Sequence, residues 1–358
     1  MQANRRRFLG GLLAAGLIPK PTWADAGGPA YLAAGAKPDG SFALCGIGKA
    51  LDITFEIPLP ARGHAAAAHP VRPEAVAFAR RPGTFALVID CVSGAVKAQL
   101  HSPEGRHFYG HGAFSQDGDW LFTTENDYEQ GQGRIGVWDV RKGYTRVGEF
   151  HSGGVGPHDI KRLPASDILV VANGGIDTHP DSGRVKLNIA TMQPNLTYLD
   201  QGEIVEVAEL PSEMHKNSIR HLAIGPDGEV AFGMQWQGDA QMSALIGQHR
   251  QGQAIQLIGA DEEDQARALD GYIGSIAYSR NGKRIAVTSP RGGVVHQYDA
   301  NELTFDQMFE LPDVCGVAPQ DRGFAITSGR GDIGSLGSAG AAFAQSDALR
   351  WDNHLVEI

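Results

Sequence analysis

Four histidines share one position of an internal repeat. His64, His111, His158 and His221 each lie four residues before the first turn of a repeated unit. If the units close into a ring, side chains at one repeated position converge on the ring axis. Neutral imidazole is a common ligand of Zn, Cu, Fe and Ni, and imidazoles without thiolates suit a transition metal better than Ca or Mg. The spacing therefore predicts a metal site built from these four residues, with iron or copper as the candidate ions.

The alternative for these histidines is a structural role. A histidine near the start of a strand can cap a turn or hydrogen-bond the backbone of a neighbouring unit. Because the units are nearly equivalent, one structural histidine could recur at the same position. The sequence leaves both interpretations open.

A second group of polar residues surrounds the predicted ends of strands. Second strands of propeller blades end at the face where inner strands begin, so the following loops are expected around the histidine mouth. Carboxylates, imidazoles, guanidinium groups and an aromatic ring together are typical of a polar ligand, metal-chelate or cofactor site. Each of them taken alone could equally be a solvated loop residue. The candidate cofactor-binding residues are Glu125, Asp127, His179, Arg184, His215, Trp236 and Arg330.

The repeated unit is about 45 residues long, a length typical of four-stranded propeller blades. One unit runs from Gly110 to Phe150, with an Asp-Gly turn and three further strand-like runs. The segment 30–60 is strand-rich, and the final residues 350–358 form a lone strand that could complete its blade. We predict an all-β, single-domain propeller of about seven four-stranded blades over residues 27–358. Related units begin near Gly63, Pro157, Arg220, Gly274 and Cys315.

Composition agrees with this fold and excludes several functions. The 358 residues include 47 Gly and 19 Pro, which indicates many tight turns between short strands. The formal net charge is −10, so the basic surface that nucleic-acid binding requires is missing. After the first 20 residues no apolar run approaches membrane-spanning length, so the mature chain is not expected to cross a membrane.

The first 26 residues have the pattern of an export signal. Asn4-Arg5-Arg6-Arg7-Phe8-Leu9 is similar to the twin-arginine consensus, and a short apolar stretch and small residues at Ala24 and Ala26 follow it. We therefore predict a signal peptide over residues 1–26, export by the twin-arginine route and a periplasmic location. This route carries folded cargo, often with a cofactor already inserted.

Two resemblances extend this interpretation. Trp138-Asp139 resembles the WD dipeptide of WD40-like propellers, but this match occurs in only one repeated unit. More broadly, the runs Gly-His-Gly-Ala-Phe-Ser (110–115), Gly-Pro-His-Asp-Ile (156–160) and Lys-Leu-Asn-Ile-Ala-Thr-Met-Gln-Pro (186–194) resemble a proteobacterial family of twin-arginine-exported proteins of unknown function. Members are typically encoded beside imelysin-type iron-uptake proteins. The resemblance implies periplasmic iron or metal handling and an imelysin-type or cytochrome-like partner, but it supplies no catalytic residues.

Three functions fit the sequence. The first is a periplasmic propeller that binds iron, copper or a metal-containing ligand at a histidine-lined channel mouth. The second is a non-catalytic scaffold that docks an iron-uptake or cytochrome partner. The third is a lactonase-like or quinoprotein-like propeller enzyme with Glu125, Asp127 or His179 as acid or base, since propellers host many activities.

Overall fold

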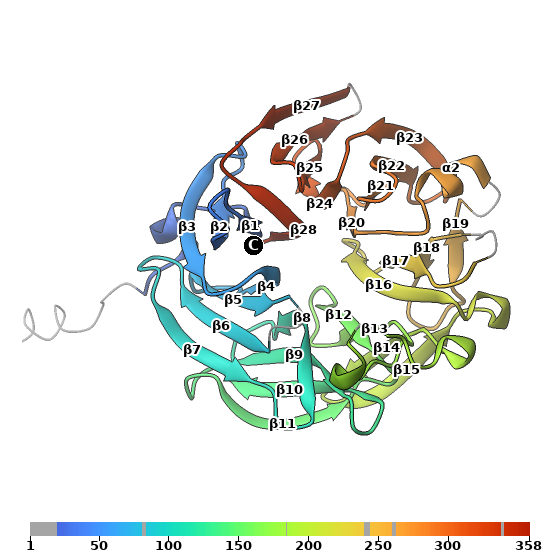
Figure 1. The fold of residues 1–358 in the computed structure, drawn as a ribbon, viewed down its shortest axis with the longest axis horizontal. Helices are drawn as coiled ribbons and strands as arrows, with labels where there is room; N and C mark the ends of the chain where they lie inside the picture. The colour runs from blue at the N-terminus through green and yellow to red at the C-terminus, as the bar shows by residue number, and fades with distance from the viewer. Residues whose placement is uncertain (1–19, 81–83, 184, 240–243, 260–262, 338–339) are drawn as a thin grey trace, which may run out of the picture.

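The computed structural model describes residues 20–358 apart from 81–83, 184, 240–243, 260–262 and 338–339. The described chain forms seven four-stranded antiparallel sheets that follow one another around a central axis (Figure 1). The predicted single-domain propeller of about seven four-stranded blades is therefore confirmed. Residues 1–19 of the predicted signal peptide lie outside the described residues, so that prediction stays untested.

Each blade has its inner strand at the axis, and the other three strands follow outward in chain order. In six blades the inner strand also comes first in the chain, whereas the inner strand of the remaining blade is β28. The inner strands surround the centre of the ring in Figure 1. They are β4 (Gly63–Ala68), β8 (Arg106–Phe114), β12 (Pro157–Arg162), β16 (Asn217–Ile224), β20 (Ser275–Tyr278), β24 (Val314–Gln320) and β28 (Arg350–Glu357).

Each blade has three outer strands outside its inner strand. They are β1 (Tyr31–Ala36), β2 (Phe42–Ile47) and β3 (Ile53–Leu59); β5 (Glu74–Ala79), β6 (Phe85–Asp90) and β7 (Val96–His101); β9 (Trp120–Asp127), β10 (Gln132–Asp139) and β11 (Thr145–His151); β13 (Leu169–Asn173), β14 (Asn195–Asp200) and β15 (Glu203–Glu209); β17 (Val230–Trp236), β18 (Ile246–His249) and β19 (Gln256–Ile258); β21 (Arg284–Ser289), β22 (Val294–Asp299) and β23 (Phe305–Glu310); and β25 (Gly323–Ser328), β26 (Asp332–Gly337) and β27 (Gly340–Gln345).

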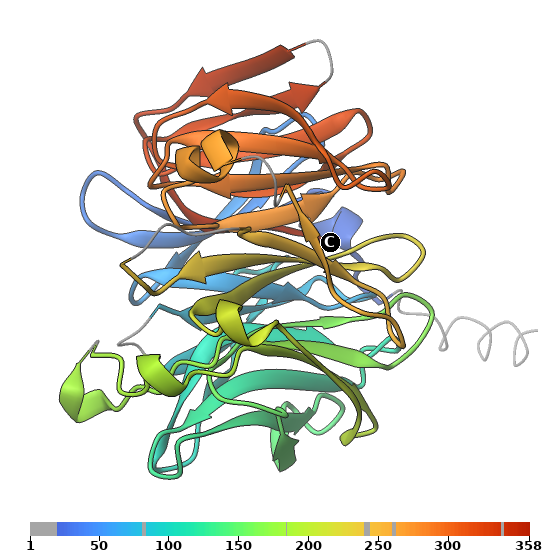
Figure 2. The same cartoon turned by 90° about the vertical axis from the view of Figure 1, so that its right-hand side faces the viewer.

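The helices are short and lie outside the sheets, one before the first strand and the others between strands. Figure 2 shows the ring edge-on, with the yellow-green segment between β13 and β14 projecting from one face. In the described ranges, none of the helices combines the length and the apolar character needed to cross a bilayer. The helical segments are η1 (Trp23–Ala26), η2 (Pro180–Ser182), η3 (Ile189–Thr191), η4 (Ser212–Met214) and α2 (Glu263–Ala268).

The hydrophobic core lies between neighbouring blades. The middle strands are buried on both faces, as in β5 and β13. The residues of the outermost strands β11 and β15 are exposed, with partly buried residues among them. One cluster joins Phe78 of β5 to Phe108 of β8 and Trp138 of β10. Burying one such aromatic side chain contributes about 1.5–3 kcal/mol, so each inter-blade layer holds its two inner strands in fixed positions.

The last strand closes the ring. β28 is the inner strand of the first blade and pairs antiparallel with β1, with Leu32 opposite Val356. This is the arrangement that the sequence predicted for residues 350–358. Near the N-terminus, η1 packs against the next blade, and Trp23 Nε1 donates a hydrogen bond of 2.9 Å to the His69 carbonyl.

Candidate metal centre

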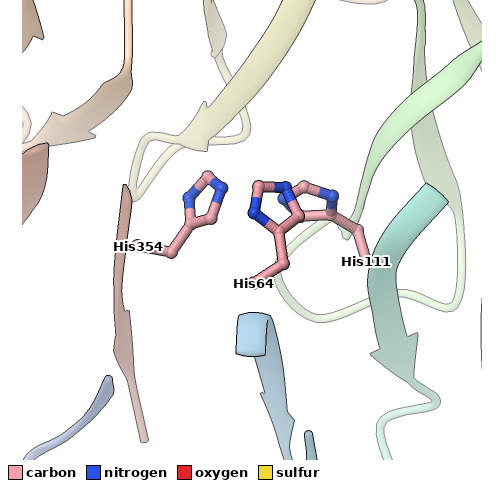
Figure 3. A group of neighbouring side chains, drawn as sticks. All are labelled: His64, His111 and His354. Carbon is pink, nitrogen blue, oxygen red and sulfur yellow. The ribbon is translucent and has the colours of Figure 1, made fainter. Parts of the chain in front are cut away.

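Five imidazoles meet at the hub of the ring. The four predicted histidines are joined by a fifth, His354 of β28, and Figure 3 shows the His64, His111 and His354 rings gathered from three different strands. The ring centroids of His64 and His111 lie 4.9 Å apart, and those of His158 and His221 lie 4.8 Å apart. The structure thus brings the four predicted residues together at the ring axis. Their role as metal ligands stays a prediction.

His354 bridges the two sides of this cluster. Its ring centroid lies 4.7 Å from that of His64, 4.8 Å from that of His111 and 5.0 Å from that of His221. The sequence predicts its strand over residues 350–358 but does not mark His354 as a ligand. The missed signal is that this strand, expected to complete the first blade, itself contains a histidine.

Irregular pairing of the inner strands accompanies every one of these histidines. The register shifts between Gly63 and Ala66 at His64, between Phe108 and Gly112 at His111, and beside His158, His221 and His354. A β-bulge bends its strand and re-aims a side chain. Two blades lack a hub histidine. In one, β20 pairs with β21 without a shift and has Ser275 at the repeated position, and in the other, β24 pairs with β25 with a shift between Val314 and Val317. Irregular pairing thus accompanies all five imidazoles but is not confined to their strands.

Most of the hub nitrogens have no hydrogen-bond partner within the described part of the chain. These buried atoms are Nδ1 of His64, both ring nitrogens of His111 and His221, and Nε2 of His354. His158 differs, because its Nδ1 lies 3.1 Å from the Arg220 carbonyl oxygen. A carbonyl only accepts, so Nδ1 is the protonated nitrogen and Nε2 keeps its lone pair. The structural alternative, in which the histidines cap turns or backbone groups, fits His158 but not His111 or His221.

The buried imidazoles are neutral. Burial holds the pKa values of His111, His158, His221 and His354 well below the usual histidine value. Neighbouring imidazoles lower them further, because a second positive charge in the hub would be repelled. Metal binding requires the neutral form of histidine, so no proton has to be removed before a first ion binds.

Asp352 supports the cluster from beside His64. Its Oδ1 lies 3.8 Å from His64 Nδ1, and its carboxylate is held by Arg62 and Arg80, each at 2.6 Å. Burial alone would raise the pKa of Asp352, but His64, Arg80 and Arg62 outweigh it and hold that pKa well below its usual value. The carboxylate is therefore charged and can orient the His64 ring, as carboxylates do beside metal-bound histidines.

Two cavities adjoin the hub. A cavity of about 230 Å³ is lined by Arg62, Asp313 and Asp352 among others. A second cavity of about 50 Å³ is lined by His111, His221, His354 and by Lys161 and Ser275. None of the five hub histidines lines the first cavity, which reaches the cluster only through Asp352. The second leaves room next to the imidazoles for a small ligand.

Asp159 also lines the smaller cavity, but it does not contact an imidazole through an observed hydrogen bond. Its Oδ1 accepts from the Ile160 amide at 2.8 Å, and its Oδ2 accepts from the Leu222 amide at 3.0 Å. The bond from the Leu222 amide joins β12 to β16, the strands that carry His158 and His221. Asp159 thus stabilises the blade contact on which the cluster depends.

Three of the predicted cofactor-binding residues, Glu125, Asp127 and Trp236, lie in strands rather than in loops. β9 continues to Asp127 because Asp127 pairs with Arg106 at the start of the long β8. Glu125 is fully buried, and Arg146 binds its carboxylate at 2.5 Å. Asp127 lies 3.4 Å from Arg106 and 3.5 Å from Arg134. Both carboxylates therefore belong to an ion network within one blade.

The other predicted residues have separate surroundings. His179 lies beside Tyr128, with ring centroids 5.0 Å apart, and its Nδ1 accepts from the Asp181 amide. The His215 side chain is partly exposed, and its Nδ1 lies 3.0 Å from the Ser212 carbonyl oxygen. Trp236 is half-buried at the end of β17, Arg330 is exposed, and Arg184 lies outside the described residues. A shared ligand site for this group stays a prediction.

Comparisons with known proteins agree with the fold and leave the chemistry open. A family model described as protein of unknown function (DUF1513) matches residues 57–358. The hydrazine synthase of Kuenenia stuttgartiensis is similar in structure, with a TM-score of 0.59 and 14% sequence identity over 93% of this chain and 98% of that one. At this identity the likeness shows the fold alone. The comparison with curated proteins found no match.

Proposed function

The chain belongs to the DUF1513 family of proteins of unknown function, and from the hub of its propeller we propose that it binds a transition metal through imidazole ligands. Iron and copper are the candidate ions. A donor set made of neutral imidazoles favours copper among the divalent ions, because affinity at nitrogen sites rises toward Cu²⁺ along the first-row series. His64, His111, His158, His221 and His354 are the proposed ligands.

One observation carries this proposal: buried imidazole nitrogens without partners face one another at the hub. A buried polar atom without a hydrogen bond costs about 1–3 kcal/mol, and several of them occur here within a few ångströms. Packing alone does not offset that cost, since apolar side chains would fill the hub without it. Binding a metal would satisfy these atoms together.

We further propose that the protein acts in periplasmic metal handling, by storing, delivering or oxidising and reducing the ion. The twin-arginine-like residues 5–7 support export, and the resemblance to proteins encoded beside iron-uptake genes supports a role in iron or copper traffic. An imelysin-type or cytochrome-like protein is the partner that this setting suggests. Docking such a partner without a metal would be the alternative function.

Elemental analysis tests the metal proposal. The protein is exported by its native route, purified without chelators and compared with the double variant His111→Ala and His158→Ala. We expect stoichiometric iron or copper in the native chain and loss of most of it in the variant. The control variant His101→Ala changes an exposed histidine of β7 and should keep the metal. A native chain without transition metal would contradict the proposal and favour the scaffold.

A further inference from the structure

We propose that the hub holds two metal ions bridged by His111, an inference that rests on the proposed metal-binding function. Among the described residues, nitrogens that lie within 4.8 Å of one another fall into two sets of three. One set is His64, His111 and His354, and the other is His111, His158 and His221. His111 belongs to both sets.

The grouping of nitrogens favours two ions over one. Nitrogens bound to the same ion at about 2.1 Å each lie at most about 4.2 Å apart. Each set of three meets this limit after small ring rotations, since its nitrogens already lie within 4.8 Å of one another. A single ion bound by all five rings would require His64 to approach His158, whose ring centroid is 6.0 Å away, and His111 to approach His221, at 6.3 Å. The strands that carry these residues are fixed by the inter-blade cores.

His111 is suited to bridge because both of its ring nitrogens are buried and without a partner in the described structure. A neutral imidazole has one lone pair and one N–H. The first ion binds the lone pair, and the second ion replaces the N–H proton, which leaves to solvent as the second metal–nitrogen bond forms. The product is an imidazolate with one ion at Nδ1 and one at Nε2.

The arrangement of the rings agrees with this role. The His111 centroid lies 4.9 Å from that of His64 and 4.8 Å from that of His354 on one side. On the other side it lies 5.0 Å from His158 and 6.3 Å from His221. The remaining pairs within each set are also close, with centroid separations of 4.7 Å for His64 and His354 and 4.8 Å for His158 and His221.

A copper titration of the metal-free full chain tests the bridge. After removal of loosely bound Cu²⁺, we expect two copper ions per chain. An imidazolate bridge couples the two unpaired spins, so the electron paramagnetic resonance signal should integrate to far less than the copper present. His64→Ala and His158→Ala each damage a different set, and each should retain one copper with a full uncoupled signal.

The outcomes separate this inference from the proposed function. If the native chain binds one copper ion, and both variants keep it or both lose it, the bridge is wrong but a metal site remains. Two coppers with a full signal would also overturn it, because the ions would be magnetically independent. No bound copper or iron would overturn both proposals. Circular dichroism of each variant shows whether the fold is retained, and His354→Ala replaces His64→Ala if that variant does not fold.

Discussion

At the scale of single residues, protonation of the hub histidines links folding to pH. Burial keeps His111, His158, His221 and His354 neutral in the folded chain. In the unfolded chain the same residues take up protons near their ordinary pKa of about 6.5. The unfolded state therefore binds more protons as the pH falls below that value, and the folded state loses stability.

We predict that the metal-free protein becomes less stable between pH 7 and pH 5. Each neutral histidine contributes a slope of up to about 1.4 kcal/mol per pH unit in the free energy of unfolding below pH 6.5. Urea denaturation at several pH values measures this slope. His221→Ala should flatten it, whereas His101→Ala, at an exposed position, should leave it unchanged. Equal slopes in the native chain and in His221→Ala would contradict the buried neutral state.

The repeated histidine position could be predicted from the sequence because it depends only on spacing from each turn. The fifth histidine was missed because its strand stands apart from the other inner strands in the chain, at the C-terminal end of the sequence. Which nitrogens lack partners could not be predicted. That depends on side chains from different blades, such as the Arg220 carbonyl beside His158.

At the scale of elements, each hub histidine lies where the pairing of its inner strand is irregular. Gly110 of β8 has φ +101°, and a Cβ atom at that position would lie 2.6 Å from His64 Cδ2. The glycine therefore permits both the irregular backbone before His111 and the close approach of the neighbouring blade.

We predict that Gly110→Ala weakens metal binding by at least tenfold, because the added methyl group displaces His64. Gly143→Ala is the matched control, since Gly143 has φ +69° but no atom within 4 Å of a Cβ. Both variants should lose about 1–2 kcal/mol of stability from the left-handed backbone. Competition with a chelator measures affinity, and equal affinities in the two variants would contradict the role of Gly110.

Strand order and blade number could be predicted from the repeat, but strand length and bulges could not. The sequence predicted a loop from Glu125 onward, yet β9 continues to Asp127. The reason is long-range: Arg106 and Arg134 pair with the Asp127 carboxylate, and Arg146 pairs with Glu125. Such contacts depend on register between strands, which a repeat pattern does not contain.

At the scale of the whole molecule, the metal hub and the closure of the ring depend on the same strand. β28 pairs with β1 and also carries His354 and Asp352. The Asp352 carboxylate reaches Arg62 and Arg80, which lie at the ends of β4 and β5 in the next blade. The first blade is thus attached to the second through the residue that also lies beside His64.

We predict that Asp352→Asn lowers the free energy of unfolding by about 3 kcal/mol, because it leaves two arginines beside a buried site without their carboxylate. Asp321→Asn is the control. That residue also pairs with an arginine, Arg280, but its side chain is 76% exposed, and its loss should cost less than about 1 kcal/mol. Urea denaturation at pH 7 measures both. Similar losses in the two variants would contradict a closing role for Asp352.

The most direct measurement is anomalous diffraction at the iron and copper absorption edges from crystals of protein exported by its native route. We predict strong anomalous density at the ring axis, bounded by His64, His111 and His354 on one side and by His158 and His221 on the other. A hub that shows ordered water and no anomalous density, in protein purified without chelators, would contradict a metal centre.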